Sequence, residues 1–112
     1  MSTTDIIQTI NKQITSNPVL IYMKGTPEAP ECGFSAAAVK SLQATGADFA
    51  YVNILQAPSI RERLPKVSNW PTFPQLFVNG ELVGGSDIVC SMAADGSLKT
   101  LLQEANVSAS AE

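Results

Sequence analysis

The chain has 112 residues, the size of one ordinary domain with a single hydrophobic core. Apolar residues make up 45% of it, charged residues 15%, and the formal net charge is -3, so the composition predicts a compact globule with no basic surface for nucleic acid. There is no histidine and there are two cysteines, Cys32 and Cys90, which excludes a Ser-His-Asp triad, a Cys-His zinc site and a disulfide scaffold.

The first half of the chain predicts a helix, a strand, a second helix and a second strand. Ile6, Ile10 and Ile14 share one helical face, because they are spaced by four residues. The run Val19–Met23 has no polar residue, as expected of a central strand covered on both faces. The expected elements are a helix that follows Ser2-Thr3-Thr4 and ends at Asn17-Pro18, a strand at 19–23, a loop at 24–31, a helix at 33–45 and a strand at 49–54.

The second half predicts a short helix, a β-hairpin and two more helices. Pro58 suits the first turn of the short helix, which Pro65 is expected to disturb after Leu64. Asn79-Gly80 is the strongest short hairpin signal, because both turn residues must adopt positive φ. The expected elements are a hairpin of strands 75–78 and 81–83, a helix capped by Asp87 and broken at Asp95-Gly96, and a last helix carrying Leu98, Leu101 and Leu102.

This order of elements predicts an α/β fold of the thioredoxin-like type. A right-handed strand–helix–strand crossover followed by an antiparallel hairpin makes a four-stranded mixed sheet, flanked by helices. We expect one domain over residues 1–106 and a flexible tail over 107–112, which is small and polar.

The start of the chain indicates neither targeting nor membrane insertion. It lacks a basic start and an unbroken apolar stretch, both of which a signal peptide needs. The longest apolar run, 19–23, is far shorter than the roughly 20 residues of a membrane-spanning helix. We therefore expect a cytoplasmic protein that does not bind membranes, in surroundings that keep thiols reduced.

Cys32 is the residue best placed for chemistry. It follows an apolar strand and a loop and stands where a helix begins, so free backbone N–H groups and the positive helix end favour its thiolate. Lys24, where the strand ends, adds a second positive influence. The alternative is a buried structural cysteine, but Glu31, Gly33 and Ser35 are polar or small and argue against an apolar pocket.

Cys32-Gly33-Phe34-Ser35 has the spacing of a redox C-x-x-C motif with the second thiol replaced by a hydroxyl. Serine cannot resolve a mixed disulfide, because exchange needs a second thiolate. What remains is one thiolate that exchanges with an external thiol or binds a soft metal. Cys90, on a predicted helix, is interpreted as a small buried hydrophobe rather than a resolving thiol.

Two further segments carry polar backbone toward a possible ligand. Pro74 precedes a strand and is a candidate cis residue, which would turn the N–H and C=O of Phe73 toward an extended peptide; a plain turn is the alternative. Gly84-Gly85-Ser86-Asp87 opens a helix whose N–H groups can hold a carboxylate while Asp87 pairs an ammonium. The alternative for Asp87 is a plain helix N-cap.

Three segments, 24–35, 70–76 and 84–88, resemble the signature segments of CGFS-type monothiol glutaredoxins, and the resemblance covers essentially the whole domain. It implies a groove for glutathione. The residues it assigns are Lys24 and Arg61 for the glycyl carboxylate, the backbone of Phe73 for the cysteinyl unit, and Ser86 and Asp87 for the γ-glutamyl end. Ser86 departs from the family, where many relatives carry cysteine, which matters little if the backbone binds. For Arg61 the alternative is a solvated basic face shared with Arg63.

The resemblance also implies a [2Fe–2S] cluster that bridges a homodimer, with ligands from Cys32 of each chain and from two glutathione thiolates. Relatives deliver clusters to apo iron–sulfur acceptor proteins and pair with BolA-like proteins, and we expect both here. The competing function is that of a monothiol oxidoreductase, which removes glutathione from protein thiols through a mixed disulfide on Cys32. The long loop before Cys32 favours the carrier, because in the family it accompanies weak reductase activity. A redox-silent interaction module is the third alternative and would need an unreactive Cys32.

Overall fold

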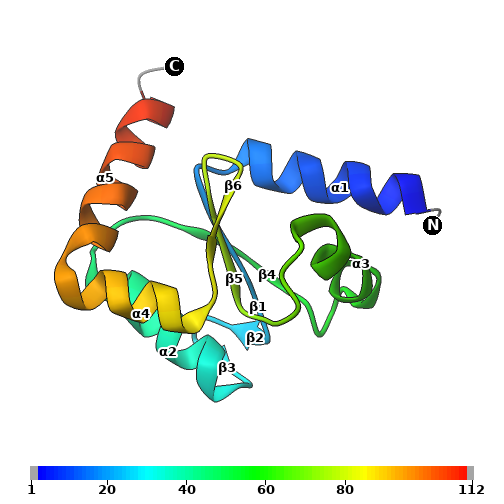
Figure 1. Ribbon diagram of the computed structural model, residues 1–112, viewed down its shortest axis with the longest axis horizontal. Helices are drawn as coiled ribbons and strands as arrows, with labels where there is room; N and C mark the ends of the chain where they lie inside the picture. Colours follow the sequence, from blue (N-terminus) through cyan, green and yellow to red (C-terminus); the bar gives the residue numbers. More distant parts are fainter. Residues whose placement is uncertain (1–2, 111–112) are drawn as a thin grey trace.

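The computed structural model describes residues 3–110 as a central sheet covered by helices on both faces. The helices are α1 (Thr3–Ser16), α2 (Gly33–Ala44), α3 (Pro58–Ser68), α4 (Ser86–Asp95) and α5 (Ser97–Ser110), and the strands are β1 (Val19–Met23), β2 (Gly25–Thr26), β3 (Ala29–Pro30), β4 (Ala50–Asn53), β5 (Gln75–Val78) and β6 (Glu81–Gly84). Figure 1 shows α1 and α3 on one side of the sheet and α2, α4 and α5 on the other. The predicted thioredoxin-like arrangement is confirmed.

The main sheet has the strand order β4-β1-β5-β6. β1 pairs in parallel with β4 and antiparallel with β5, so the sheet is mixed, as predicted. The hairpin turn between β5 and β6 has positive φ at both residues, 52° at Asn79 and 81° at Gly80, which confirms the turn signal. β1 is therefore the inner strand from which the chain passes directly into the segment before Cys32.

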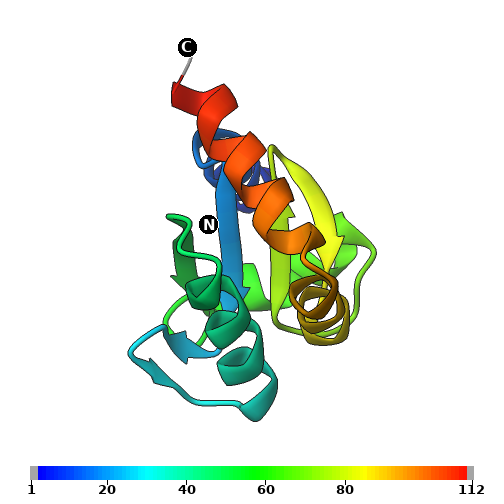
Figure 2. The same cartoon turned by 90° about the vertical axis from the view of Figure 1, so that its left-hand side faces the viewer.

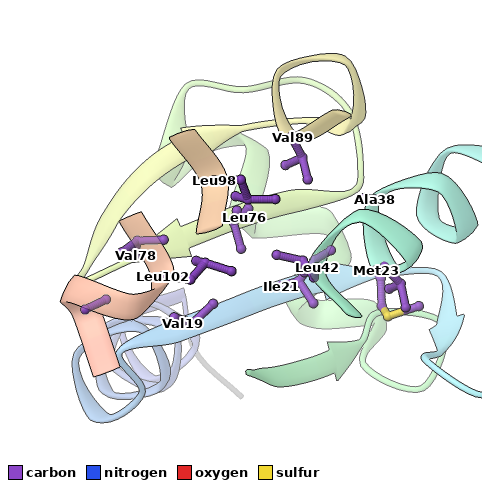
Figure 3. Close-up of a cluster of buried hydrophobic side chains, with 12 residues drawn as sticks. Val19, Ile21, Met23, Ala38, Leu42, Leu76, Val78, Val89, Leu98 and Leu102 are labelled. Atoms are coloured by element: carbon purple, nitrogen blue, oxygen red, sulfur yellow. The ribbon is translucent and has the colours of Figure 1, made fainter. Parts of the chain in front are cut away.

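Each face of the sheet packs its own hydrophobic cluster. Side chains of successive β1 residues point to opposite faces, so Ile21 packs against α2, α4 and α5 while Leu20 and Tyr22 pack against α1 and α3. Figure 3 shows the first cluster, with β1, β5 and the helices contributing the labelled side chains. All five residues of β1 are buried, and this burial explains why the strand has no polar position.

α3 continues past Pro65 to Ser68, so the prediction that this proline would disturb the helix after Leu64 was wrong. Proline removes one backbone donor and costs stability inside a helix. Leu64 and Ile60 are buried in the cluster with α1, and this apolar contact offsets that cost. The helix ends at Asn69, which adopts the left-handed conformation with φ of 57°.

Other details also differ from the expectations. The segment predicted as a loop contains a two-residue hairpin, β2–β3. The N-cap of α4 is Gly85 rather than Asp87, which lies in the first helical turn. α5 continues to Ser110, so residues 107–110 are helical where we expected a tail, and residues 111–112 lie outside the described residues.

Within residues 3–110, no helix combines the length and the apolar character that a membrane span requires.

Candidate functional site

A groove of about 700 Å³ lies where the segment after β1, the segment before β5 and the beginnings of α2 and α4 meet. Its lining residues are Lys24, Cys32, Phe34, Arg61, Pro65, Trp70, Pro71, Thr72, Phe73, Gly85, Ser86, Asp87 and Ile88. All six residues that the sequence singled out as site residues line this groove, although they come from separate parts of the chain. Their individual roles stay predictions, but the fold does bring them together.

Cys32 is the N-cap residue of α2 and is partly exposed. Its side chain makes no capping hydrogen bond, and its backbone is extended, with φ of -151°. The pKa of the Cys32 thiol lies below its ordinary value, chiefly because the backbone N–H of Ser35 points at the sulfur; the N–H of Phe34 and the Lys24 ammonium add to this, while burial opposes it. This environment favours a reactive thiolate over a structural thiol.

Ser35 stands where a C-x-x-C motif carries its second thiol, and its side chain is fully buried. The hydroxyl oxygen accepts a hydrogen bond from the backbone N–H of Lys24 at 3.1 Å. The hydroxyl also lowers the pKa of Cys32 by hydrogen bonding to the sulfur. Ser35 therefore links the end of β1 to the thiolate instead of supplying a resolving thiol.

Cys90 is half-buried, so the expectation of a buried hydrophobe was only partly right. It lies on α4, and the hydroxyl of Ser41 donates a hydrogen bond to its sulfur at 3.5 Å. Ser41 is nine residues after Cys32 (41 - 32), which corresponds to about 13 Å along α2. Both cysteines are free, and Cys90 lies beside a later turn of α2 than the one that carries Cys32.

The charged side chains of the groove come from different faces of the fold. Arg61 is on α3 and Asp87 is on α4, and these helices cover opposite faces of the sheet (Figure 1). Lys24 follows β1 directly. Among the described residues, none of these three side chains forms an ion pair. The groove thus offers two cations and one carboxylate to a ligand.

The segment before β5 is fixed by a side chain that sequence reasoning missed. Gln75 is fully buried, and its Nε2 donates to the carbonyl oxygens of Trp70, at 2.9 Å, and Thr72, at 3.1 Å. The peptide bond between Phe73 and Pro74 is cis, as the sequence predicted. The two hydrogen bonds of Gln75 hold the segment that carries Phe73 at the groove. The sequence does not indicate these hydrogen bonds, because a single glutamine forms no recognisable motif.

The close approach of this segment to α4 favours a glycine at position 85. A Cβ atom on Gly85 would lie 3.2 Å from the indole Nε1 of Trp70, closer than most side-chain contacts allow. Sequence reasoning saw Gly85 only as part of a helix opening, because close packing between distant segments leaves no local pattern.

Two apolar side chains at the rim of the groove were also missed. Phe34 is 64% exposed and Ile88 is 37% exposed, and both line the groove that contains Cys32. Their signal in the sequence was a large apolar residue inside or next to a motif otherwise made of small and polar residues. They give the groove an apolar rim in addition to its charges.

The described part of the chain contains no group of three or more His, Cys, Asp or Glu side chains arranged to hold a metal ion. At the groove the chain offers one soft ligand, the sulfur of Cys32. Such a donor fits a metal centre that completes its ligands from elsewhere.

The glutaredoxin family model matches residues 19–83. Glutaredoxin 4 of Escherichia coli strain K12 is 61% identical over 104 residues, covering 93% of this chain and 89% of the relative. Glutaredoxin 4 of Pasteurella multocida is 56% identical over 100 residues, covering 89% of this chain and 92% of the relative. The match therefore extends across nearly the full length of both relatives.

Among solved structures, reduced apo GrxS14 of poplar superposes with a TM-score of 0.79 at 40% identity, covering 94% of this chain and 96% of that one. The glutathione complex of buckwheat glutaredoxin has a TM-score of 0.80 at 24% identity, with 92% of each chain covered, and shows likeness of fold alone.

Proposed function

Because this chain belongs to the glutaredoxin family, we propose that it binds glutathione in the groove beside Cys32 and carries a [2Fe–2S] cluster between two copies of itself. The cluster is cargo, to be delivered to apo iron–sulfur proteins. The observation that carries this proposal is that the groove holds a single thiol, Cys32, whose pKa is lowered and whose C-x-x-S motif has no resolving partner.

Glutathione matches the charges of the groove. The tripeptide carries two carboxylates and one ammonium, and the groove carries two cations, Lys24 and Arg61, and one carboxylate, Asp87. In the proposed orientation the cations hold the glycyl carboxylate and Asp87 holds the γ-glutamyl ammonium. The backbone of Phe73 pairs with the cysteinyl unit, and the N–H of Ser86, in the uncapped first turn of α4, binds the γ-glutamyl carboxylate. This orientation directs the ligand's thiol toward Cys32.

The number of thiolate ligands that the chain can supply favours a cluster shared between two copies. A [2Fe–2S] cluster takes about four thiolate ligands, and histidine, which replaces some in related centres, is absent from this chain. One Cys32 from each of two copies supplies half of them, and two bound glutathiones supply the rest. The exposed Phe34 and Ile88 beside Cys32 supply apolar surface on which a second copy can pack.

We further propose apo iron–sulfur proteins as acceptors, a BolA-like protein as a second partner, and the cytoplasm as the location. A free, partly exposed thiol with a lowered pKa supports a reducing compartment, because such a thiol is readily oxidised elsewhere. Both kinds of partner would reach the cluster at the exposed rim of the groove.

The second candidate function is glutathione-dependent thiol exchange. The Cys32 thiolate attacks the glutathione sulfur of a protein–glutathione mixed disulfide; the disulfide breaks, the protein leaves as a thiolate, and Cys32 holds glutathione. Because Ser35 cannot attack this bond, a second glutathione thiolate must do so, releasing oxidised glutathione and restoring Cys32. The lowered pKa of Cys32 favours this reaction as well.

Anaerobic reconstitution separates the two functions. The protein is incubated with ferric iron and sulfide, with and without glutathione, and its absorption and sedimentation are measured. We expect a coloured dimer with about one cluster per two chains only when glutathione is present. Cys90→Ser is the matched control and should load as the wild type does, whereas Cys32→Ser should stay colourless. A colourless wild-type monomer that rapidly reduces mixed disulfides would make thiol exchange the principal function.

A further inference from the structure

The chain between β1 and α2 forms a small hairpin beside the thiol. β2 and β3 pair antiparallel, with Gly25 opposite Pro30 and Thr26 opposite Ala29. In Figure 2 this hairpin, in cyan, projects next to the first turns of α2. The hairpin ends at Pro30, two residues before Cys32, so its position affects the position of the thiol.

The hairpin starts with a turn that only glycine fits. Gly25 has φ of 93°, and a Cβ atom there would lie 2.6 Å from the carbonyl oxygen of Ala29 and 2.7 Å from the backbone nitrogen of Glu31. The N–H of Glu31 donates to the carbonyl oxygen of Lys24 at 2.9 Å, which closes the hairpin at its base. The two ends of the hairpin are thus in direct contact.

Asn53, the last residue of β4, ties this hairpin to the sheet. Its Oδ1 accepts two backbone hydrogen bonds, one from Gly25 and one from Leu55, each at 3.0 Å. The N–H of the intervening Ile54 donates to the carbonyl oxygen of Met23 at 2.9 Å. One amide oxygen therefore joins the chain leaving β1 to the chain leaving β4.

Hydrogen bonds on both sides of Lys24 hold its backbone in place. Its N–H donates to the buried hydroxyl of Ser35, its carbonyl oxygen accepts from Glu31, and the next N–H, that of Gly25, is held by Asn53. Lys24 has an ammonium that acts on the Cys32 sulfur. The contact through Asn53 is the one side-chain contact in this set that comes from an element other than β1, α2 and the connection between them.

We propose that Asn53 is a positioning residue, which fixes the hairpin of residues 24–31 and thereby holds the side chain of Lys24 at the groove beside Cys32. The proposal extends the function inferred for the groove and rests on it only in so far as Lys24 binds a carboxylate of glutathione there. Asn53 touches neither the sulfur nor the groove. It acts through Gly25 and Lys24.

The test compares Asn53→Ala, which removes the accepting oxygen, with Asn53→Asp, which keeps it. Asn17→Ala is the matched control, because it removes an asparagine hydrogen bond, from Nδ2 to the carbonyl oxygen of Gln13, at the end of α1. Amide hydrogen exchange is measured by NMR on the apoprotein, without glutathione or cluster. The affinity for glutathione is measured separately by isothermal titration calorimetry.

In Asn53→Ala we expect exchange at Gly25 and Glu31 to accelerate by about tenfold or more relative to wild type, while exchange at Tyr22 and Leu42 stays within about twofold. The affinity for glutathione should fall severalfold, because Lys24 is no longer held at the groove. In Asn53→Asp the exchange at Gly25 should remain protected, and in Asn17→Ala both readouts should match wild type.

Unchanged exchange at Gly25 in Asn53→Ala would overturn the proposal, as would an unchanged affinity for glutathione in a loosened hairpin. So would failure of Asn53→Asp to retain protection. Equal acceleration at Tyr22 and Gly25 would assign Asn53 a general structural role instead and would equally reject positioning. None of these readouts requires a cluster, so they are independent of whether the carrier function holds.

Discussion

α2 and α4, which begin at the groove, differ at their starts from α5, which begins away from it. α2 starts at Cys32 and α4 starts at Gly85, and neither has a side-chain capping hydrogen bond. At the start of α5, the carboxylate of Asp95 accepts hydrogen bonds from the backbone N–H of Ser97, at 2.8 Å, and from its hydroxyl, at 2.6 Å. A carboxylate therefore satisfies the first free N–H group of α5, whereas no capping side chain does so at α2 and α4.

This difference shows how stability and binding compete at a helix start. A capping side chain typically contributes about 1 kcal/mol, but it occupies the N–H groups that would otherwise bind an anion. At α2 those groups point at the Cys32 sulfur, and at α4 we propose that they bind a carboxylate of glutathione. α3 also begins without a side-chain cap, at Ala57, but Pro58 in its first turn leaves one fewer N–H to satisfy.

The largest expected effect comes from replacing the uncapped cysteine by a capping residue. Cys32→Ser should abolish iodoacetamide labelling at this position and cluster loading, because no sulfur remains in the groove. The same change should raise the free energy of unfolding by about 1 kcal/mol, because serine is a good N-cap. Labelling by mass spectrometry and urea unfolding measure the two effects. Retained cluster loading would refute the ligand assignment, and lower stability would refute the capping argument.

The next largest effect separates the roles of Asp87, at the start of α4, and Asp95, at the start of α5. Asp87→Asn, in the first turn of α4, should weaken glutathione binding by about tenfold, since it removes a charge-assisted contact with the ligand's ammonium. Asp95→Asn should leave the affinity unchanged. Isothermal titration calorimetry measures both, and equal affinities for Asp87→Asn and wild type would remove Asp87 from the binding site.

The pH dependence of Cys32 tests the uncapped start of α2 itself. The pKa of Cys32 is lowered, so its thiolate should persist as pH falls below about 8.5, the ordinary thiol value, and should disappear only at the lowered pKa. Ser35→Ala and Lys24→Gln should each move the alkylation midpoint up toward the ordinary value. A wild-type midpoint at or above that of a free thiol would contradict the proposed environment.

The smallest effect concerns the capped start of α5. The pKa of Asp95 is lowered, first by the Ser97 hydroxyl and then by its N–H, so the stabilisation it provides is present above the ordinary carboxyl pKa and is lost as pH falls through the lowered one. Asp95→Asn should therefore slightly lower the melting temperature at neutral pH and reduce its fall in acid. Cys32 alkylation should not change. Equal acid sensitivity in variant and wild type would show that the cap contributes nothing.

Local patterns in the sequence were sufficient for much of this fold. The unbroken apolar run of β1, the Asn79-Gly80 turn and the cis Pro74 each follow from conformational limits of a few residues, and all three are confirmed. The six groove residues came from short motifs combined with a family resemblance, and the structure places them together. Such features are predictable because a few neighbouring residues determine them.

Features that depend on distant contacts were not predictable in the same way. Pro65 is accommodated because Leu64 is buried against another helix, and the hairpin before Cys32 is held by Asn53, 28 positions after Gly25. Gly85 matters because Trp70 packs on it. In each case the stabilising partner lies elsewhere in the chain, so no local pattern reveals it.

Native mass spectrometry of the anaerobically reconstituted protein tests most directly whether Cys32 supplies the chain's single ligand. It is run on wild type, Cys32→Ser and Cys90→Ser with isotopically labelled glutathione. The predicted species, in wild type and in Cys90→Ser, is two chains with one [2Fe–2S] cluster and two labelled glutathiones, and Cys32→Ser should show the bare chain only. A cluster bound without glutathione, on a single chain, or retained in Cys32→Ser would contradict the shared-cluster function.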